Sequence, residues 1–240
     1  MNNSLRLSLS SNSTNSSFLS LRLDFNAFFL NSSGSSVATD PAGNVYVTGT
    51  TRFNGLPVKN AFQPTYGGGF TDVFVAKFNS SGSLVFCTYF GGSLGDESQA
   101  IAVDQSGNSY ITGRTISIDF PTKNAFHKIN YGNQEPDAFV AKFNTNGGLV
   151  FSTYLGGSSN DGGNDIVVDS QGNCFIVVPT LSSDFLLKNT FQTTFSYGHY
   201  DIFVAKFSSN GSLLYSTFFG GNSDDFGYSI AVDKSDNILN

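Results

Sequence analysis

Short apolar runs separated by turn signals recur along most of the chain. Around residues 100–115, two such runs flank the turn Asp-x-x-Gly-Asn, in which Asp bonds its own backbone and Gly supplies a positive φ. The same pattern occurs at residues 37–51, at 166–180 and from Ile230 onward. Each occurrence predicts a β-hairpin, and the turn Asp returns every 64 or 65 residues, as Asp40, Asp104, Asp169 and Asp233.

Two further landmarks keep this spacing. The first landmark is the segment Phe-Val-Ala-Lys-Phe, which occurs three times. The second is an aromatic or aliphatic residue followed by Gly-Gly, which occurs farther along in each of these repeats. In the second repeat the pattern predicts four strands, a to d, at residues 99–103, 109–115, 138–144 and 149–155. A loop of roughly 20 residues joins strands b and c and carries a recurring Asn-Ala-Phe or Asn-Thr-Phe, whose Phe we expect to anchor the loop.

Four antiparallel strands at even spacing are typical of a β-propeller blade. We therefore predict an all-β chain with three full blades and partial ones, forming an incomplete or open propeller, with a β-trefoil as the alternative. Residues 1–30 are a low-complexity lead-in with one degenerate strand, and residues 31–240 are the repeat domain, with repeats at about 37–98, 99–163, 164–227 and a partial 228–240. Open sheet edges would permit self-association.

Strand c is apolar on both faces, as expected for a sheet covered on each side. Its two Phe residues and Ala share one face, while Val and Lys share the other, which points toward a neighbouring blade or the rim. A cation in a packed layer needs a partner, so we predict one Lys–Asp pair per repeat. The lysines are Lys77, Lys142 and Lys206, and the candidate partners are Asp72, Asp137 and Asp201 before strand c or Asp104, Asp169 and Asp233 at the a–b turn.

Composition narrows the function classes. The net charge is −6 and no basic stripe is visible, so nucleic acid is not expected as a partner. No run of 18 apolar residues predicts a membrane span, and residues 1–20 show no signal peptide. Cys87 and Cys174 occupy non-equivalent positions of different repeats, which predicts unpaired thiols.

No residue set predicts catalysis, a metal or a cofactor. Ser93 lies in a Gly-x-Ser-x-Gly motif, but a strand rather than a helix is expected to follow, so we interpret Ser93 as a turn residue. His127 and His199 lack a repeated acid partner and are expected at the surface. The Asp-rich turns lack the ligand spacing of a Ca²⁺ loop, which favours turn and capping roles.

The second repeat carries a longer motif. It reads Gly-Asp-x-x-x-x-Ile-Ala-Val-Asp-x-x-Gly-Asn-x-Tyr-Ile-Thr-Gly-x-Thr, then Asp-Phe-Pro-Thr, Asp-x-Phe-Val-Ala-Lys-Phe and Tyr-Leu-Gly-Gly. This motif resembles the SBBP family of bacterial β-propeller repeats, and the resemblance extends over about Val37 to Asn240. It implies a propeller fold and usually an exported or surface-associated protein, with no agreed activity and no catalytic residues. The first repeat departs from the pattern, because Ser32 stands where the others have Asp96, Asp161 and Asp225.

The strands carry what the repeats share, and the b–c loops carry what differs between them, which suits a recognition module. We predict a non-enzymatic scaffold or binding module, extracellular or at the cell surface, whose loops present tyrosines to an unknown protein or glycan. These residues are Tyr66, Tyr131, Tyr197 and Tyr200. Two alternatives stay open: a truncated fragment of a larger propeller protein without independent activity, and a propeller hydrolase or lyase with a site at a central channel.

Overall fold

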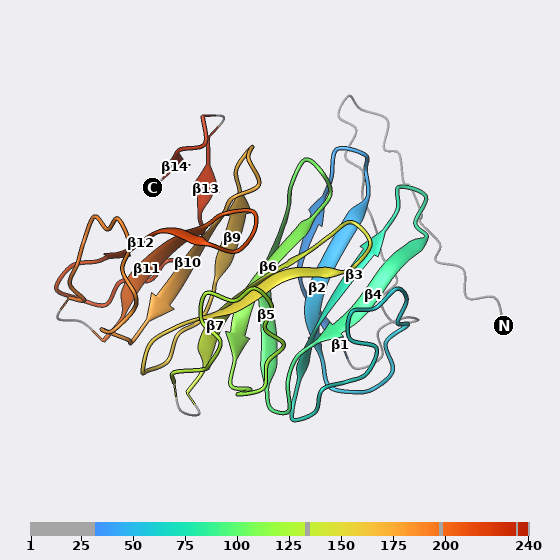
Figure 1. Ribbon diagram of the computed structural model, residues 1–240, viewed down its shortest axis with the longest axis horizontal. Coiled ribbons are helices and arrows are strands. Elements are labelled where there is room, and N and C mark those ends of the chain that lie inside the picture. The colour runs from blue at the N-terminus through green and yellow to red at the C-terminus, as the bar shows by residue number, and fades with distance from the viewer. Residues whose placement is uncertain (1–31, 133–134, 197–198, 234, 240) are drawn as a thin grey trace, which may run out of the picture.

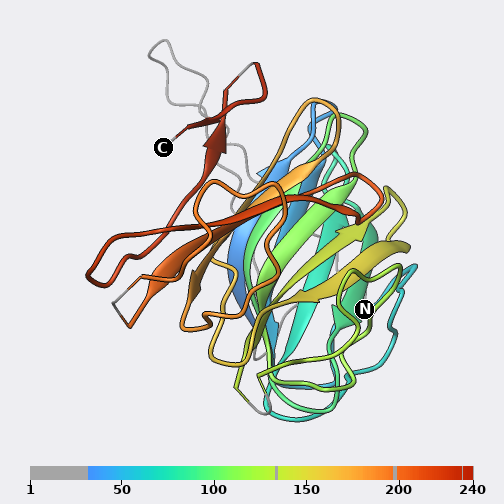
Figure 2. The same cartoon turned by 60° about the vertical axis from the view of Figure 1, so that its left-hand side comes forward.

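The computed structural model describes residues 32–132, 135–196, 199–233 and 235–239. This part of the chain is all-β, with three four-stranded antiparallel sheets and one two-stranded sheet. Figure 1 shows the sheets side by side in chain order, and Figure 2 shows the last hairpin beyond the third sheet. The described residues contain no helix that could span a membrane. The degenerate strand expected within residues 1–30 lies outside the described residues.

Each large sheet is one repeat, with its strands in chain order. The first blade contains β1 (Ser32–Thr39), β2 (Val45–Thr51), β3 (Asp72–Phe78) and β4 (Leu84–Phe90). The second contains β5 (Asp96–Val103), β6 (Ser109–Thr115), β7 (Asp137–Phe143) and β8 (Leu149–Leu155). The third contains β9 (Asp165–Val168), β10 (Cys174–Thr180), β11 (Asp201–Phe207) and β12 (Leu213–Phe219). The hairpin of β13 (Ala231–Val232) and β14 (Ile238–Leu239) follows. The predicted blades are therefore confirmed.

One strand begins earlier than its pattern predicts. In the second repeat strand a starts at Asp96 rather than at residue 99. A bulge between Ser98 and Ala100 interrupts its pairing with β6. An extra residue at a bulge breaks the two-residue alternation, and this hides the first half of the strand from a periodicity analysis.

Both faces of β7, the c strand of the second blade, are buried between blades. Phe139 and Phe143 of β7 face the first blade, where their rings lie 6.1 Å and 5.2 Å from that of Phe90. Val140, on the opposite face, belongs to the core shared with the third blade. All three side chains of β7 are fully buried. Burying each Phe contributes about 1.5–3 kcal/mol, so contact with the neighbouring blades stabilises the second blade.

The b–c loop of each blade covers the outer edge of strand d. In the first blade Lys59 Nζ donates to the Leu84 carbonyl at 2.7 Å, and Asn60, at φ 44°, donates to the Val85 carbonyl at 3.0 Å. The same two bonds recur in the other blades, from Lys123 and Asn124 and from Lys188 and Asn189. These contacts protect the edges where another chain could pair. The Lys that precedes each recurring Asn was overlooked in the sequence analysis.

The Lys of strand c pairs with the Asp of the a–b turn. Lys206 Nζ lies 3.0 Å from Asp169 Oδ2, and Lys142 Nζ lies 3.9 Å from Asp104 Oδ2. The predicted pair is thus confirmed in the third and second repeats, and Asp72, Asp137 and Asp201 are not the partners. In the first repeat the prediction is wrong, since among the described residues Lys77 has no carboxylate within 4.0 Å. Its amine lies over the Tyr46 ring, 4.9 Å from the centroid.

A tyrosine links each of the first two blades to the next. The Tyr46 hydroxyl lies 3.0 Å from Asp40 Oδ2 and 2.8 Å from the Gly107 carbonyl oxygen of the second blade. Tyr110 makes the corresponding contact to the Gly172 carbonyl at 2.8 Å. These bonds join consecutive a–b turns and fix how far one blade slides along the other.

The third blade changes both sides of this link. Phe175 replaces the tyrosine, and Asp236, at φ 63°, replaces the turn glycine. A Cβ on Gly107 would lie 2.9 Å from the Tyr46 hydroxyl, whereas Phe175 has no hydroxyl and leaves room for a side chain. The Asp236 carboxylate instead accepts bonds from the backbone N–H and hydroxyl of Ser170. The two replacements are therefore complementary.

The fully buried ring of Phe139 provides a test of the blade stacking. We expect Phe139→Ala to lower the free energy of unfolding by about 3–5 kcal/mol, measured by urea denaturation. Phe70→Ala is the matched control, because Phe70 is 81% exposed and its loss should change stability by less than about 0.5 kcal/mol. Equal losses in the two variants would contradict the assignment of β7 to the core.

The Phe175 and Asp236 replacements can be tested together. Phe175→Tyr should destabilise the protein, because its hydroxyl would meet the Asp236 side chain. Adding Asp236→Gly should restore the tyrosine link of the other blades, so the two changes should couple favourably by about 1 kcal/mol. Urea unfolding of the two single variants and the double variant measures this coupling, and additive effects would refute it.

Candidate functional site

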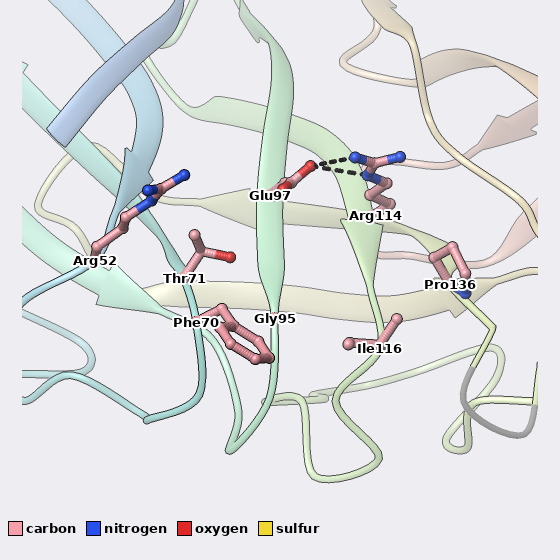
Figure 3. A pocket seen from close by; sticks show the side chains of 8 residues that line it. All are labelled: Arg52, Phe70, Thr71, Gly95, Glu97, Arg114, Ile116 and Pro136. Atoms are coloured by element: carbon pink, nitrogen blue, oxygen red, sulfur yellow. Dashed lines mark hydrogen bonds and ion pairs between the residues drawn. The ribbon is translucent and has the colours of Figure 1, made fainter.

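A groove opens at the junction of the first and second blades, with a volume of about 460 Å³. It lies where the b strands end and the c strands begin (Figure 3). Residues from both blades line it: Arg52, Phe70 and Thr71 from the first, Gly95, Glu97, Arg114, Ile116 and Pro136 from the linker and the second. A surface shared by two blades can hold side chains that are distant in sequence.

The floor of this groove, which we call the junction groove, is held by backbone bonds. Thr71 and Gly95 form a parallel bridge, and the Asp96 amide donates to the Thr71 carbonyl at 2.8 Å. The Ile116 amide donates to the Gly95 carbonyl at 3.0 Å. The linker between the blades is therefore fixed on both sides, and the side chains around it project from a rigid base.

The charges of the junction groove leave one arginine uncompensated. Glu97 and Arg114 face each other across β5 and β6, and Glu97 Oε2 accepts bonds from Arg114 Nε at 2.8 Å and Nη2 at 2.6 Å. Figure 3 shows Glu97 turned toward Arg114 and away from Arg52. Within the described chain, Arg52 has no ion pair or hydrogen bond. The groove thus carries a free guanidinium in a chain of net charge −6.

The junction groove also exposes aromatic surface. Phe70 is 81% exposed at its rim, and the nearby Phe53 is 56% exposed. A second hollow, of about 580 Å³, shares Arg52, Thr71 and Glu97 with the groove. Its remaining lining is mostly hydroxyl and amide side chains, among them Ser33, Ser35, Ser98, Thr50 and Gln99. Together the two hollows form one elongated surface with an apolar, cationic end and a hydroxyl-rich end.

The side chains that give the junction groove its charge and aromatic surface do not recur in the other repeats. At the next junction Ile116 stands where the first has Arg52, and Glu135 stands where it has Phe70. Gly162 and Pro179 replace Glu97 and Arg114. Arg52 and Arg114 are also the only arginines among the residues that the structure describes. The blade fold does not require these side chains, so their convergence marks the first junction as chemically distinct. The sequence analysis missed them, although their departure from the repeat was a visible signal.

The tyrosines expected to bind a ligand lie on the loops of three successive blades. Tyr66 packs edge-to-face against Tyr89 at 6.0 Å and is partly buried. Tyr131 is 49% exposed beside His127, and the ring of Tyr200 lies 5.0 Å from that of Phe226. Tyr197 lies outside the described residues. No ring contact or hydrogen bond joins the three described tyrosines to one another, and their role in binding stays a prediction.

Buried acid pairs lie beneath the Gly-Gly linkers. Asp72 Oδ2 accepts a bond from the Gly67 amide at 2.7 Å, while its Oδ1 is buried without a hydrogen-bond partner in the described chain. Asp96 accepts bonds from the Gly92 amide at 2.8 Å and the Ser117 hydroxyl at 2.9 Å. The Asp137 and Asp161 carboxyls occupy the same places in the next repeat.

Burial governs the protonation of these acids. Loss of water raises the pKa of Asp72 to about 7 and that of Asp96 to about 6, and the nearby carboxylates add to both effects. Asp137 and Asp161 repeat these pKa values of about 7 and about 6 for the same reasons. All four side chains are fully buried; Asp96 and Asp161 hold the linkers, and Asp72 and Asp137 hold the b–c loops. In the first blade Ser32 takes the place of the Asp and donates to Thr51 at 2.9 Å.

Other chemical candidates have structural roles. The amide and hydroxyl of Ser93 donate to Asp119 Oδ1 at 2.8 Å and 3.0 Å, and β5 follows, which confirms the interpretation as a turn. The surface prediction for His127 is wrong, because its ring is buried and stacks on Phe126 at 4.4 Å. Cys87 and Cys174 are free, buried thiols. The described residues hold no group of three or more His, Cys, Asp or Glu placed to bind a metal.

The open surface of the third blade is a face rather than an edge. Phe62 and Phe126 of the first two b–c loops reach Phe143 and Phe207 of the following blades. Phe191, their equivalent in the third, is 79% exposed. It lines an apolar hollow of about 520 Å³ with residues including Val204, Phe226, Tyr228 and Ile230. Self-association stays a prediction, and this face is the surface that favours it.

The acid pairs predict a pH dependence of stability. A carboxyl whose pKa is about 7 when folded and about 3.9 when unfolded binds more protons in the folded state between these values. The contribution of Asp72 and Asp137 to the free energy of unfolding is therefore largest at low pH, and it is lost as pH rises through about 7. We expect the melting temperature to fall between pH 5 and pH 8 through these two groups.

Comparison with variants isolates this effect. Asp72→Asn with Asp137→Asn should reduce the fall and leave the smaller part that Asp96 and Asp161 contribute up to about pH 6, whereas Glu135→Gln, at an exposed acid, should retain the whole fall. His127 acts in the opposite direction, because burial lowers its pKa, and it is unchanged in every variant. A double variant that loses stability with pH as the parent does would contradict the assignment.

Comparison with known proteins identifies the repeat. The family model SBBP, described as a beta-propeller repeat, matches residues 31–57 and 85–121. The first match spans the β1–β2 hairpin, and the second extends from β4 through the linker to β6 and the loop after it. No curated protein matches the chain. These matches coincide with the motif and with strands of the first two blades, so the chain carries the SBBP β-propeller repeat in these two segments.

Proposed function

We propose that this protein is a non-enzymatic binding module that acts outside the cytoplasm and holds its ligand in the junction groove. One observation carries the proposal. Both arginines of the described chain converge with the exposed Phe70 at a single blade junction, where the repeat does not require them. Large exposed aromatic rings beside a free cation are typical of recognition surfaces.

The construction of the groove supports this proposal. Its base is fixed by backbone bonds between the blades, so a ligand would meet side chains already in place. Its walls come from the ends of the b–c loops and the linker, which vary between repeats. The low charge and the Ser-, Asn- and Gly-rich composition suit an extracellular or cell-surface domain.

The positions of the acidic side chains fit a binding protein better than an enzyme. Asp72, Asp96 and their counterparts are fully buried beneath the linkers, out of reach of any substrate. Glu97, the acid that lines the junction groove, is engaged by Arg114. A hydrolase or lyase commonly needs an accessible acid or base near the reacting bond. The groove offers recognition groups instead.

Binding arrays test the proposal. The intact chain should bind a subset of glycans or peptides, and Arg52→Gln should abolish most of that signal because it removes the free cation. Lys128→Gln is the matched control, since it removes one exposed charge outside the groove. Full binding by Arg52→Gln, or no binding by the parent chain, would contradict the proposal.

A further inference from the structure

We infer that the junction groove binds a carboxylated sugar, a uronate unit within a longer saccharide. The inference rests on the proposed function and names its ligand class. It depends on three features of the surface: the free guanidinium of Arg52, the exposed ring of Phe70 and the hydroxyl-rich hollow that adjoins them.

The guanidinium selects a carboxylate. Arg52 has all its N–H donors available within the described chain, and a planar guanidinium matches a carboxylate with two parallel hydrogen bonds. Arg114 is already neutralised by Glu97, so a ligand acid adds to Arg52 without breaking an ion pair. One free positive charge accommodates one carboxylate, whereas a polyanion such as nucleic acid would meet the net negative charge of the chain.

The apolar wall of the groove would contact the sugar ring that carries the carboxylate. Phe70 presents most of its ring to solvent, and Ile116 and Pro136 lie on the other side of the groove (Figure 3). A pyranose ring carries C–H groups on its faces and places its carboxyl one bond from the ring. The sugar face can therefore pack on Phe70 while the carboxylate reaches Arg52.

The adjoining hollow would bind the rest of the saccharide. Ser33, Ser35 and Thr50 offer hydroxyls, and Gln99 offers an amide, so each both donates and accepts hydrogen bonds. Sugar hydroxyls have the same dual capacity. A second sugar unit bound there extends the ligand along the elongated surface. The next junction replaces Arg52 with Ile116 and Phe70 with Glu135, so one such site is expected per chain.

Calorimetric titration of the intact chain tests the inference with defined probes. Aldotetraouronic acid, a xylotriose that bears a single glucuronate, should bind with one site per chain and at least about 10-fold more tightly than neutral xylotetraose. Arg52→Gln should weaken the acidic ligand about 10-fold or more, and added salt should weaken it further. Phe70→Ala should weaken it several-fold, while Lys128→Gln should stay within about 2-fold of the parent. Arg52 and Phe70 are exposed, and unchanged melting curves would confirm that the variants fold.

Each other outcome has a defined meaning. Equal affinity for the acidic and neutral sugars, with loss on Phe70→Ala, would overturn the uronate inference and leave the groove as a binding site. Binding of hexaglutamate but of neither sugar, dependent on Arg52, would also overturn the inference while supporting the proposed function. Binding that is indifferent to both Arg52→Gln and Phe70→Ala, or no binding to any probe, would overturn both.

Discussion

The packing of one blade on the next is the interaction on which this structure depends. A four-stranded sheet with two apolar faces cannot be stable alone, because each face exposes side chains that water does not favour. In β7 the Phe139 face closes the first junction and the Val140 face closes the second, so a single strand belongs to two cores. The stability of each blade therefore depends on the blades beside it, through the apolar contacts at each junction.

Polar groups set the register that apolar packing leaves open. The Tyr46 and Tyr110 hydroxyls join consecutive a–b turns at one end of the blades. At the other end, the buried Asp96 carboxyl holds the Gly-Gly linker and the buried Asp72 carboxyl holds the b–c loop. Phe175 shows that a junction tolerates loss of its tyrosine when the facing turn changes with it. The buried polar groups thus align the blades, while the apolar faces hold them together.

The junction groove follows from this architecture. The a strands of the first and second blades contact each other, and at this junction the loop ends of the two blades leave the groove. The floor of this groove is made by backbone bonds between the two blades. Side chains there are free to vary, and at the first junction they supply Arg52, Arg114 and Phe70. Recognition chemistry is added where the fold imposes no requirement.

The sequence by itself determined the repeat, the four strands of each blade, the two faces of strand c and the presence of a partner for Lys142 and Lys206. These properties follow from local turn chemistry and from the two-residue period of a strand, both of which are written in consecutive residues. Tertiary structure alone decided which Asp meets the lysine, that His127 is buried, and that Arg52 and Arg114 share a groove although 62 residues separate them. Those outcomes depend on how twisted sheets stack and where their loop ends meet, and the pattern within any one strand carries no record of that geometry.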